Sequence, residues 1–307
     1  MGWNEHTFNK RSQGNQEGKT GTKAEKVGIG MVTVLYNPKE EYIRNIKQFC
    51  IGIDCALIVD NSPTSNEDLV RKTLSTEITV IYLYQDGLNL GLCKAINIGM
   101  DELIKHGYEW GLYIDQDSRY CNDILPIYRK LIESKKESHR IGVIGPQHEF
   151  DRRRLKRKSG YKEKEWLMTS GCIFNLKVFD SIGGFDERIF LDGLDVEYCL
   201  RCRKHEYKVI QCREAIVHHH PANTRELNLG ILKLKYGWDK PERYYYKIRA
   251  DKYINTHYKT WYCIGDMIIK YFKIIFLFDE KKRYLKAFKK GIKDAQNGVF
   301  GKNRTEL

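Results

Sequence analysis

The segment GLYIDQDS, from Gly111 to Ser118, constrains the fold most, because an apolar run there passes directly into two carboxylates. The apolar half predicts a buried parallel strand, and such strands present ligand-binding side chains at their carboxyl ends. On an extended backbone Asp115 and Asp117 point to the same side. Two carboxylates placed in this way suit a divalent cation that keeps some waters and also binds phosphate. A strand that ends in a solvated acidic turn is the simpler alternative.

The sequence around this segment alternates between strand and helix patterns. Helical patterns, such as the one over about 38–50, separate short β-rich runs that end at turn residues. The predicted strands are 28–35, 55–59, 78–84, 111–115, 141–145 and 166–174. This order predicts an α/β protein with a Rossmann-like, mostly parallel central sheet and helices on both faces.

Composition narrows the class of protein without choosing a function. The 307 residues carry a formal charge of +13 and 41% hydrophobic residues, enough for a substantial core. Basic clusters at 152–164 and 281–293 would attract nucleic acid, anionic lipid or a phosphorylated substrate, and charge alone does not distinguish these partners. Nine cysteines without a regular framework indicate reduced thiols in a cytoplasmic protein.

Three segments are expected along the chain. Residues 1–26 are polar and lack the apolar core of a signal peptide, so they are interpreted as a disordered tail. Residues 27–262 form the main domain. Residues 263–307 form an amphipathic, basic helical extension, which could lie on anionic lipid at the inner face of the cell membrane or remain a solvated tail.

Several residues besides the acidic pair could contribute chemistry. Asp60 follows a strand, where a carboxylate commonly meets a nucleotide. Lys94 lies at a helix start after Gly91, where free N–H groups can bind phosphate, although an ordinary loop would look the same. Asp195 belongs to an acidic cluster at another helix start and is a candidate general base, although acidic residues favour any helix N-terminus. His218 ends an apolar run and could complete a metal site with Asp117, or be structural.

Taken together, these pieces resemble family-2 glycosyltransferases with the A-type nucleotide-diphospho-sugar transferase fold. Within that family the chain is most similar to bacterial rhamnosyltransferases that build cell-surface polysaccharide. The resemblance covers about residues 28–300. The motifs that carry it are VTVLYNP (32–38), VDNSP (59–63), NLGLCKAINIG (89–99), YIDQDS (113–118), MTSGCIF (168–174), GGFDERIFLDGLDVEYCLR (183–201) and RYYYKIR (243–249).

The resemblance implies a role for particular residues. Asp60 would contact the nucleotide base, helped by Thr33 and Tyr36. Lys94 and Asn97 would lie near the ribose and the diphosphate. Asp117, with Asp115, would hold Mg²⁺ or Mn²⁺ on the diphosphate, and His218 would be a further ligand. Asp195 would be the catalytic base of an inverting reaction.

The implied partners are a nucleotide-sugar donor, either dTDP-rhamnose or a UDP-sugar, and a glycan or lipid-linked glycan acceptor. Two features depart from the family pattern: Cys93 and Lys94 replace smaller residues, and Arg249-Ala250 replaces an expected Arg-Asn pair. A nucleotidyltransferase would share the metal carboxylates and the fold class, but the glycine-rich basic loop expected of it does not follow the first strand. A basic nucleic-acid-binding protein would explain the charge. No recognised nucleic-acid motif is present, so we expect no nucleic-acid partner.

Overall fold

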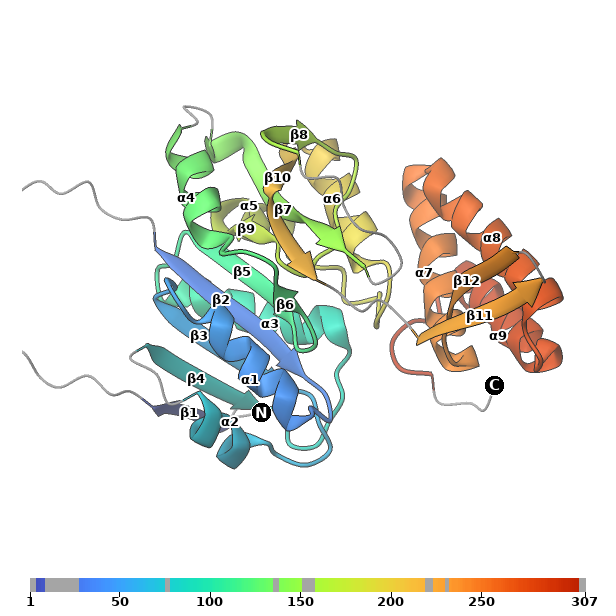
Figure 1. Ribbon diagram of the computed structural model, residues 1–307, viewed down its shortest axis with the longest axis horizontal. Helices are drawn as coiled ribbons and strands as arrows, with labels where there is room; N and C mark the ends of the chain where they lie inside the picture. The colour runs from blue at the N-terminus through green and yellow to red at the C-terminus, as the bar shows by residue number, and fades with distance from the viewer. Residues whose placement is uncertain are drawn as a thin grey trace, which may run out of the picture.

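The computed structural model describes residues 4–8, 28–74, 78–134, 138–150, 158–218, 223–229 and 232–303. A large sheet with helices on its faces forms one part of the molecule, and three helices with a β-hairpin form a second part beside it (Figure 1).

The large sheet has a parallel core with antiparallel strands added to it. Its strand order is β1-β4-β3-β2-β5-β9-β7-β10-β6, and β8 also pairs with β10. Neighbours in the set β4-β3-β2-β5 are parallel, as are β7 and β10, while β9 runs antiparallel between β5 and β7. The strands are β1 Asn4–Phe8, β2 Ile29–Leu35, β3 Cys55–Asp60, β4 Thr79–Tyr84, β5 Trp110–Asp115, β6 Arg119–Tyr120, β7 Ile141–Glu149, β8 Tyr161–Glu163, β9 Ile173–Asn175 and β10 Lys208–His218.

Buried strand residues alternate between two hydrophobic cores, one on each face of the sheet. In β2, Met31 belongs to one core and Val32 to the other, as period-2 geometry requires of a strand covered on both faces. Helices α1, α2 and α4 cover one face, while α3, α5 and α6 cover the other. These helices are α1 Glu40–Phe49, α2 Glu67–Thr73, α3 Leu92–Lys105, α4 Leu125–Ser134, α5 Leu176–Ile182 and α6 Leu194–Lys204. The predicted fold class is therefore confirmed.

Strand β2 lies at the point where the chain order of the sheet reverses. Strands β3 and β4 follow it on one side and β5 on the other, so that Val34 of β2 pairs in parallel register with Asp115 of β5. Crevices at such reversals, beyond the carboxyl ends of the strands, are where open α/β sheets bind ligands. The acidic segment singled out in the sequence ends at this crevice.

Three local expectations need correction. Residues 4–8 of the tail expected to be disordered form β1, which pairs antiparallel with β4; residues 1–3 and 9–26 lie outside the described residues. The predicted strand over 166–174 is irregular until Ile173, because the chain turns at Gly171, whose φ is +80°. Within the basic cluster at 152–164, where no strand was predicted, residues 161–163 form β8 on the edge of β10; residues 152–157 are not described.

The second part of the molecule is formed by a hairpin and three helices. Its elements are β11 Asn223–Leu229, β12 Leu232–Trp238, α7 Pro241–Tyr258, α8 Trp261–Leu277 and α9 Lys281–Gln296. A separate aromatic core that contains Tyr244, Phe278 and Tyr284 holds these elements together. Because Ala250 and Ile254 of α7 also belong to the core beneath α6, α7 contacts both parts. The predicted division of the chain at residue 262 stays a prediction.

Arg249 of α7 is buried and fastens the segment after α9. Its guanidinium is 2% exposed and donates to the carbonyl oxygens of Gly301 at 2.6 Å and Val299 at 3.3 Å, and to the Tyr245 hydroxyl at 3.0 Å. The Arg249 side chain therefore has a structural role in this chain.

Candidate active site

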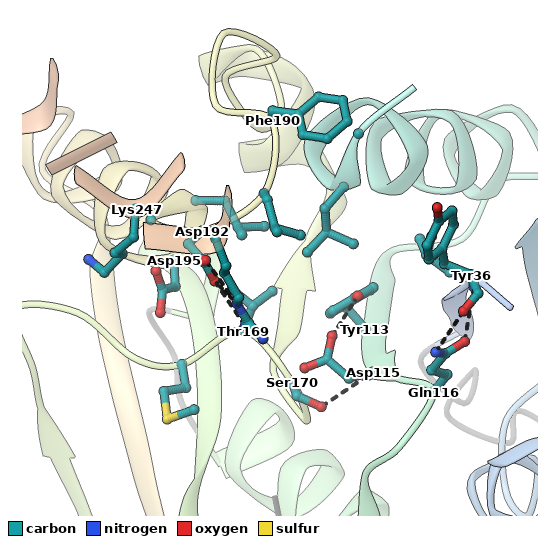
Figure 2. Close-up of a pocket in the computed structure, with 18 of the residues that line it drawn as sticks. Tyr36, Tyr113, Asp115, Gln116, Thr169, Ser170, Phe190, Asp192, Asp195 and Lys247 are labelled. Atoms are coloured by element: carbon teal, nitrogen blue, oxygen red, sulfur yellow. Dashed lines mark hydrogen bonds and ion pairs between the residues drawn. The ribbon is translucent and has the colours of Figure 1, made fainter. Parts of the chain in front are cut away.

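A cavity of about 640 Å³ opens beyond the carboxyl ends of β2 and β5. It is bounded by three groups of residues that are distant in sequence: the ends of the central strands, the segment before β9 together with the start of α6, and the inner face of α7. Its polar lining includes Tyr36, Asn61, Asn89, Asp115, Gln116, Asp117, Thr169, Ser170, Asp192, Asp195, Arg243 and Lys247 (Figure 2).

Hydrogen bonds fix the acidic segment at the floor of the cavity. The Tyr113 hydroxyl donates to Asp115 Oδ1 at 2.7 Å, and the Asp115 N–H donates to Ser170 Oγ at 3.0 Å. Gln116 bonds the backbone of Tyr36 in both directions, at 3.0 and 3.2 Å, and so ties the end of β5 to the end of β2. The Asp-Gln-Asp corner is consequently held in one position by both neighbouring segments.

Asp195 lies on the other side of the cavity, at the start of α6. The preceding Gly193 has φ +100°, and a Cβ there would come within 2.9 Å of the Ala250 Cβ, so only glycine allows this close approach to α7. Burial raises the pKa of Asp195 to about 6, although the nearby Lys247 ammonium and the Val196 N–H favour its charged form. A carboxylate that titrates near neutrality is suited to accept a proton from a hydroxyl group.

Helix α7 contributes two cations to the lining that the sequence analysis did not single out. Arg243 forms a bidentate ion pair with Asp192, three residues before Asp195. Lys247 pairs with Asp251 at 2.5 Å and with Asp266 of α8 at 3.1 Å. Burial would lower the pKa of Lys247, but these two carboxylates raise it, so the side chain carries a positive charge. Figure 2 shows Asp192, Asp195 and Lys247 together on one side of the cavity and Asp115 facing them.

Two aromatic side chains complete this wall. The rings of Trp166 and Tyr262 lie 4.7 Å apart and both line the cavity. Burial is the main cause that raises the pKa of Tyr262, and the Asp195 carboxylate, which lines the same cavity, contributes to it. Aromatic rings next to carboxylates offer an apolar face beside polar groups, which suits a ligand that has both apolar and hydroxyl-bearing surfaces.

The structure brings four of the predicted site residues into the cavity lining: Tyr36, Asp115, Asp117 and Asp195. Two others are turned into the interior of the sheet. Thr33 is buried and donates its hydroxyl to the Ile114 carbonyl oxygen at 2.6 Å. The Asp60 carboxylate is also buried and accepts hydrogen bonds from Ser62, Asn66 and Tyr82. Thr33 and Asp60 therefore bond within the protein and do not line the cavity, whereas Asn61, the residue after β3, does. The expected contacts of Thr33 and Asp60 with a nucleotide stay predictions.

Lys94 and Asn97 also lie outside the cavity lining. Asn97 bonds the backbone of Phe185 in both directions, at 2.8 and 2.9 Å. The Lys94 ammonium lies 3.7 Å from Glu187. The first N–H of α3, that of Leu92, has no acceptor within the helix. It donates to the Phe190 carbonyl oxygen at 2.7 Å. These contacts connect α3 to the loop before α6, and the predicted ribose and diphosphate contacts of Lys94 and Asn97 stay predictions.

His218 ends β10 and lies opposite Arg119 of β6 in the antiparallel register. It does not line the cavity. Over the described part of the chain, no three His, Cys, Asp or Glu side chains come together closely enough to hold a metal ion. His219 and His220 fall in the range 219–222, which the structure does not describe.

Comparison with known proteins supports the assignment of the fold and the family resemblance. No protein-family model matches the chain. The dTDP-rhamnosyl transferase RfbF of Shigella flexneri is 23% identical over 294 residues, which cover 89% of this chain and 96% of that protein. The O-antigen biosynthesis protein RfbC of Myxococcus xanthus is 40% identical over 65 residues, which cover 20% of this chain and 5% of that protein.

Solved structures share the fold at low sequence identity. The S. aureus protein TarS, residues 1–349 in complex with UDP-GlcNAc, superposes with a TM-score of 0.54 and 12% identity over 89% of this chain and 84% of that chain. GalNAc-T7, crystallised with UDP, GalNAc and Mn²⁺, superposes with a TM-score of 0.51 and 11% identity over 90% of this chain. The superposition covers 57% of the GalNAc-T7 chain.

The molecule therefore has the A-type nucleotide-sugar transferase fold. The predicted resemblance to bacterial rhamnosyltransferases is confirmed by the similarity to RfbF, which extends over most of both chains.

Proposed function

We propose that this protein is a glycosyltransferase that moves a sugar from a nucleoside-diphosphate donor to a cell-surface polysaccharide or a lipid-linked glycan. One observation carries the proposal: a single cavity brings Asp115 and Asp117, at the carboxyl end of β5, opposite Asp195 at the start of α6. The first pair suits the diphosphate end of a donor, and the second position suits the acceptor hydroxyl. A sugar bound between them would be within reach of both groups.

We propose dTDP-rhamnose as the donor, because the similarity to RfbF extends over most of both chains. A UDP-sugar is the alternative, since the TarS and GalNAc-T7 crystals contained UDP or a UDP-sugar. Tyr36 and Asn61 lie at the ends of the two strands that border the crevice, and we propose that they contact the nucleotide base. Both nucleotides have a pyrimidine base, so this part of the cavity suits either donor.

The donor set at the cavity floor fits Mg²⁺ or Mn²⁺, because carboxylate oxygens and water are the ligands that these ions prefer. We propose that Asp115 and Asp117 would hold such an ion, whose contribution when bound is to neutralise charge on the diphosphate. His218, as a further ligand, would have to reach the ion from outside the cavity lining. Arg243 and Lys247 supply additional positive charge on the opposite wall.

We propose that transfer is a single displacement with inversion at the anomeric carbon. Asp195 would accept the proton of the acceptor hydroxyl as that oxygen forms its bond to the anomeric carbon. The bond from this carbon to the diphosphate oxygen would break, and the nucleoside diphosphate would leave with the electron pair. Trp166 and Tyr262 would place the acceptor ring next to Asp195. A cytoplasmic location, as expected from the composition, fits a protein that consumes nucleotide sugars.

The proposal is tested by the melting temperature of the purified chain with dTDP, UDP, GDP and their common sugar conjugates, with and without Mn²⁺. A ligand at 100 times its Kd adds roughly 2.7 kcal/mol to the free energy of unfolding, which a melting curve resolves. A metal-dependent rise with dTDP or dTDP-rhamnose supports the proposed donor. A rise with UDP alone would keep the reaction and replace the donor. No rise with any nucleotide would contradict the proposal.

A further inference from the structure

Helix α8 exposes a row of large apolar side chains on one face. Six of the large apolar side chains exposed in the described residues belong to this helix. Trp261 is 84% exposed and Phe276 is 71% exposed; Ile268, Ile269 and Phe272 are between 50% and 56% exposed. The spacing of these five positions puts them on one side of an α-helix, opposite Cys263 and Ile274, which are fully buried. We call the five residues the α8 stripe.

The inner face of α8 is held firmly, so the exposure of the α8 stripe does not result from a poorly packed helix. Thr260 caps the first turn by accepting a hydrogen bond from the Tyr262 N–H. Asp266 forms ion pairs with Lys270 of α8 at 2.6 Å and with Lys247 of α7 at 3.1 Å. These contacts fix the rotation of the helix about its axis. Because the inner face is held in this way, the α8 stripe points away from the rest of the protein.

The neighbouring helix α9 provides positive charge beside the α8 stripe. Residues 281–293 contain seven Lys or Arg residues and no acidic residue. Four exposed lysines, Lys282, Lys286, Lys289 and Lys293, recur at helical spacing on the side of α9 away from the core. The rings of Tyr271 and Phe288 lie 5.7 Å apart, so α8 and α9 run side by side. Helices α8 and α9 thus combine an apolar row with a cationic one.

We propose that α8 and α9 form a surface that binds an anionic lipid bilayer. The α8 stripe would enter the interface between headgroups and acyl chains, where tryptophan and phenylalanine are favoured, and the α9 lysines would contact anionic headgroups. No helix in the described ranges is long and apolar enough to cross a membrane, so α8 would lie along the bilayer surface. A row of five large apolar side chains left in water is unusual unless something covers it.

The charge beside the α8 stripe favours a bilayer over a second copy of the chain as the occupant. Two copies that met through this face would bring the lysines of both α9 helices toward each other, and like charges oppose such a contact. An anionic bilayer would contact both rows, because its interface would take up the α8 stripe and its headgroups would pair with the α9 lysines.

This inference goes beyond the transfer reaction and does not depend on it. If it holds, Lys247, which lines the cavity and pairs with Asp266 of α8, connects the transfer site to the membrane-facing helix. The acceptor cavity would then open close to a bilayer.

The test is co-sedimentation of the full chain with phosphatidylcholine vesicles that contain or lack phosphatidylglycerol. We expect binding only to the vesicles with phosphatidylglycerol, and weaker binding as salt is added. The triple change Lys282→Gln, Lys286→Gln and Lys289→Gln should weaken vesicle binding roughly 100-fold. Phe272→Ser with Phe276→Ser should abolish the binding that remains at high salt. Ile51→Ser, which removes a 70%-exposed side chain after α1, is the matched control and should bind like the unchanged chain.

Three results would overturn the proposal. One is no sedimentation of the unchanged chain with either vesicle. Another is equal binding by the unchanged chain and both sets of variants. The third is a dimer in light scattering that the two serine changes convert to a monomer, without any vesicle binding; the α8 stripe would then be a contact between copies. Nucleotide-dependent melting shifts should be the same in all variants, which separates this proposal from the transfer reaction.

Discussion

Arg243 of α7 holds Asp192 through two parallel hydrogen bonds, with Nε–Oδ2 and Nη2–Oδ1 distances that are both 3.0 Å. The pair connects two segments that are 51 residues apart and fixes the loop that leads into Asp195. Because both partners also line the cavity, the loop conformation and the charge on the cavity wall depend on the same contact.

Replacing Arg243 with lysine should lower turnover more than it lowers stability. Lysine keeps the charge but cannot form the planar two-bond contact with Asp192, so the loop before Asp195 would shift. A small displacement of a catalytic group costs roughly 10- to 100-fold in rate. Because the Arg243 side chain is 42% exposed, the ion pair itself contributes at most about 1 kcal/mol to the free energy of unfolding. Arg71→Lys, which alters a similar pair with Glu67 on α2, is the control for kinetics and melting.

Asp195→Asn should reduce the rate of transfer by about 10²- to 10⁴-fold, since a general base typically contributes this much. Donor binding should be nearly unchanged, because the asparagine keeps the shape of the side chain and lies away from the Asp115 end of the cavity. Turnover and the nucleotide-dependent melting shift measure the two effects separately. Asp68→Asn, an exposed change on α2, should alter neither. Near-normal turnover of the Asp195 variant would exclude this residue as the base.

The pKa of Asp195 predicts opposite pH effects on activity and stability. Burial raises this pKa from about 3.9 in the unfolded chain to about 6 in the folded protein, so the folded state favours the protonated form. The carboxyl therefore costs no stability below pH 4 and destabilises the fold progressively as the pH rises through 6. Turnover, which requires the carboxylate, should fall as the pH drops below 6.

The same titration makes Asp195→Asn a stabilising change at neutral pH. We expect a gain of about 1–3 kcal/mol in the free energy of unfolding at pH 7, because the neutral amide avoids the cost of a buried charge. The gain should disappear at pH 4, where the native carboxyl is protonated in the folded state. Urea unfolding of both proteins at the two pH values measures it. A gain that is equal at both pH values would show that titration is not its cause.

Asp117→Ala should remove the part of the donor-induced melting shift that depends on Mn²⁺. Carboxylates at this position would share the ion with the diphosphate, so the loss of one should weaken metal binding strongly. Chelation of divalent ions should lower the shift of the unchanged protein to that of the variant. Glu149→Ala, at the end of β7, is a control carboxylate outside the cavity lining. A variant that keeps the full Mn²⁺ response would place the ion elsewhere.

Asp60→Asn should destabilise the protein by about 1–3 kcal/mol, because the buried carboxylate accepts hydrogen bonds from Tyr82 and Asn66 that an amide cannot all accept. The nucleotide-induced melting shift should be kept, since the side chain does not line the cavity. Tyr82→Phe, which removes one of these donors, should cost less. A variant with unchanged unfolding and no nucleotide response would return Asp60 to its predicted contact with the base.

Much of the fold could be predicted because the central strands are short, fully apolar and end at strong turn residues. The run Cys55–Asp60 illustrates this, since it is buried along its whole length on both faces. The segment 166–174 could not be predicted equally well. It has the composition of a strand, but the positive φ of Gly171 turns the chain, and that torsion depends on packing against Pro146 and Val217.

The candidate site was predictable where a strand end alone determines the position of a side chain. Asp115 and Asp117 reach the cavity because β5 ends there. Thr33 and Asp60 also lie at or near strand ends. The direction of their side chains depends on hydrogen bonds with the Ile114 carbonyl and the Tyr82 hydroxyl, and no local sequence pattern indicates these bonds. Arg243 and Lys247 lie in an aromatic and basic helix that looks like a solvated surface, and only the contact of α7 with α6 brings them to the site.

The buried guanidinium of Arg249 has a practical consequence for anyone who shortens the chain. Two of its acceptors are the carbonyl oxygens of Val299 and Gly301, which lie after α9. A chain cut before residue 299 would keep every helix and strand, yet it would leave a charge buried without these partners, a change that is usually strongly destabilising. Removing α8 and α9 would in addition uncover the aromatic core on α7. Point substitutions are therefore the sound way to study α8 and α9, and purification tags belong beyond Gly301.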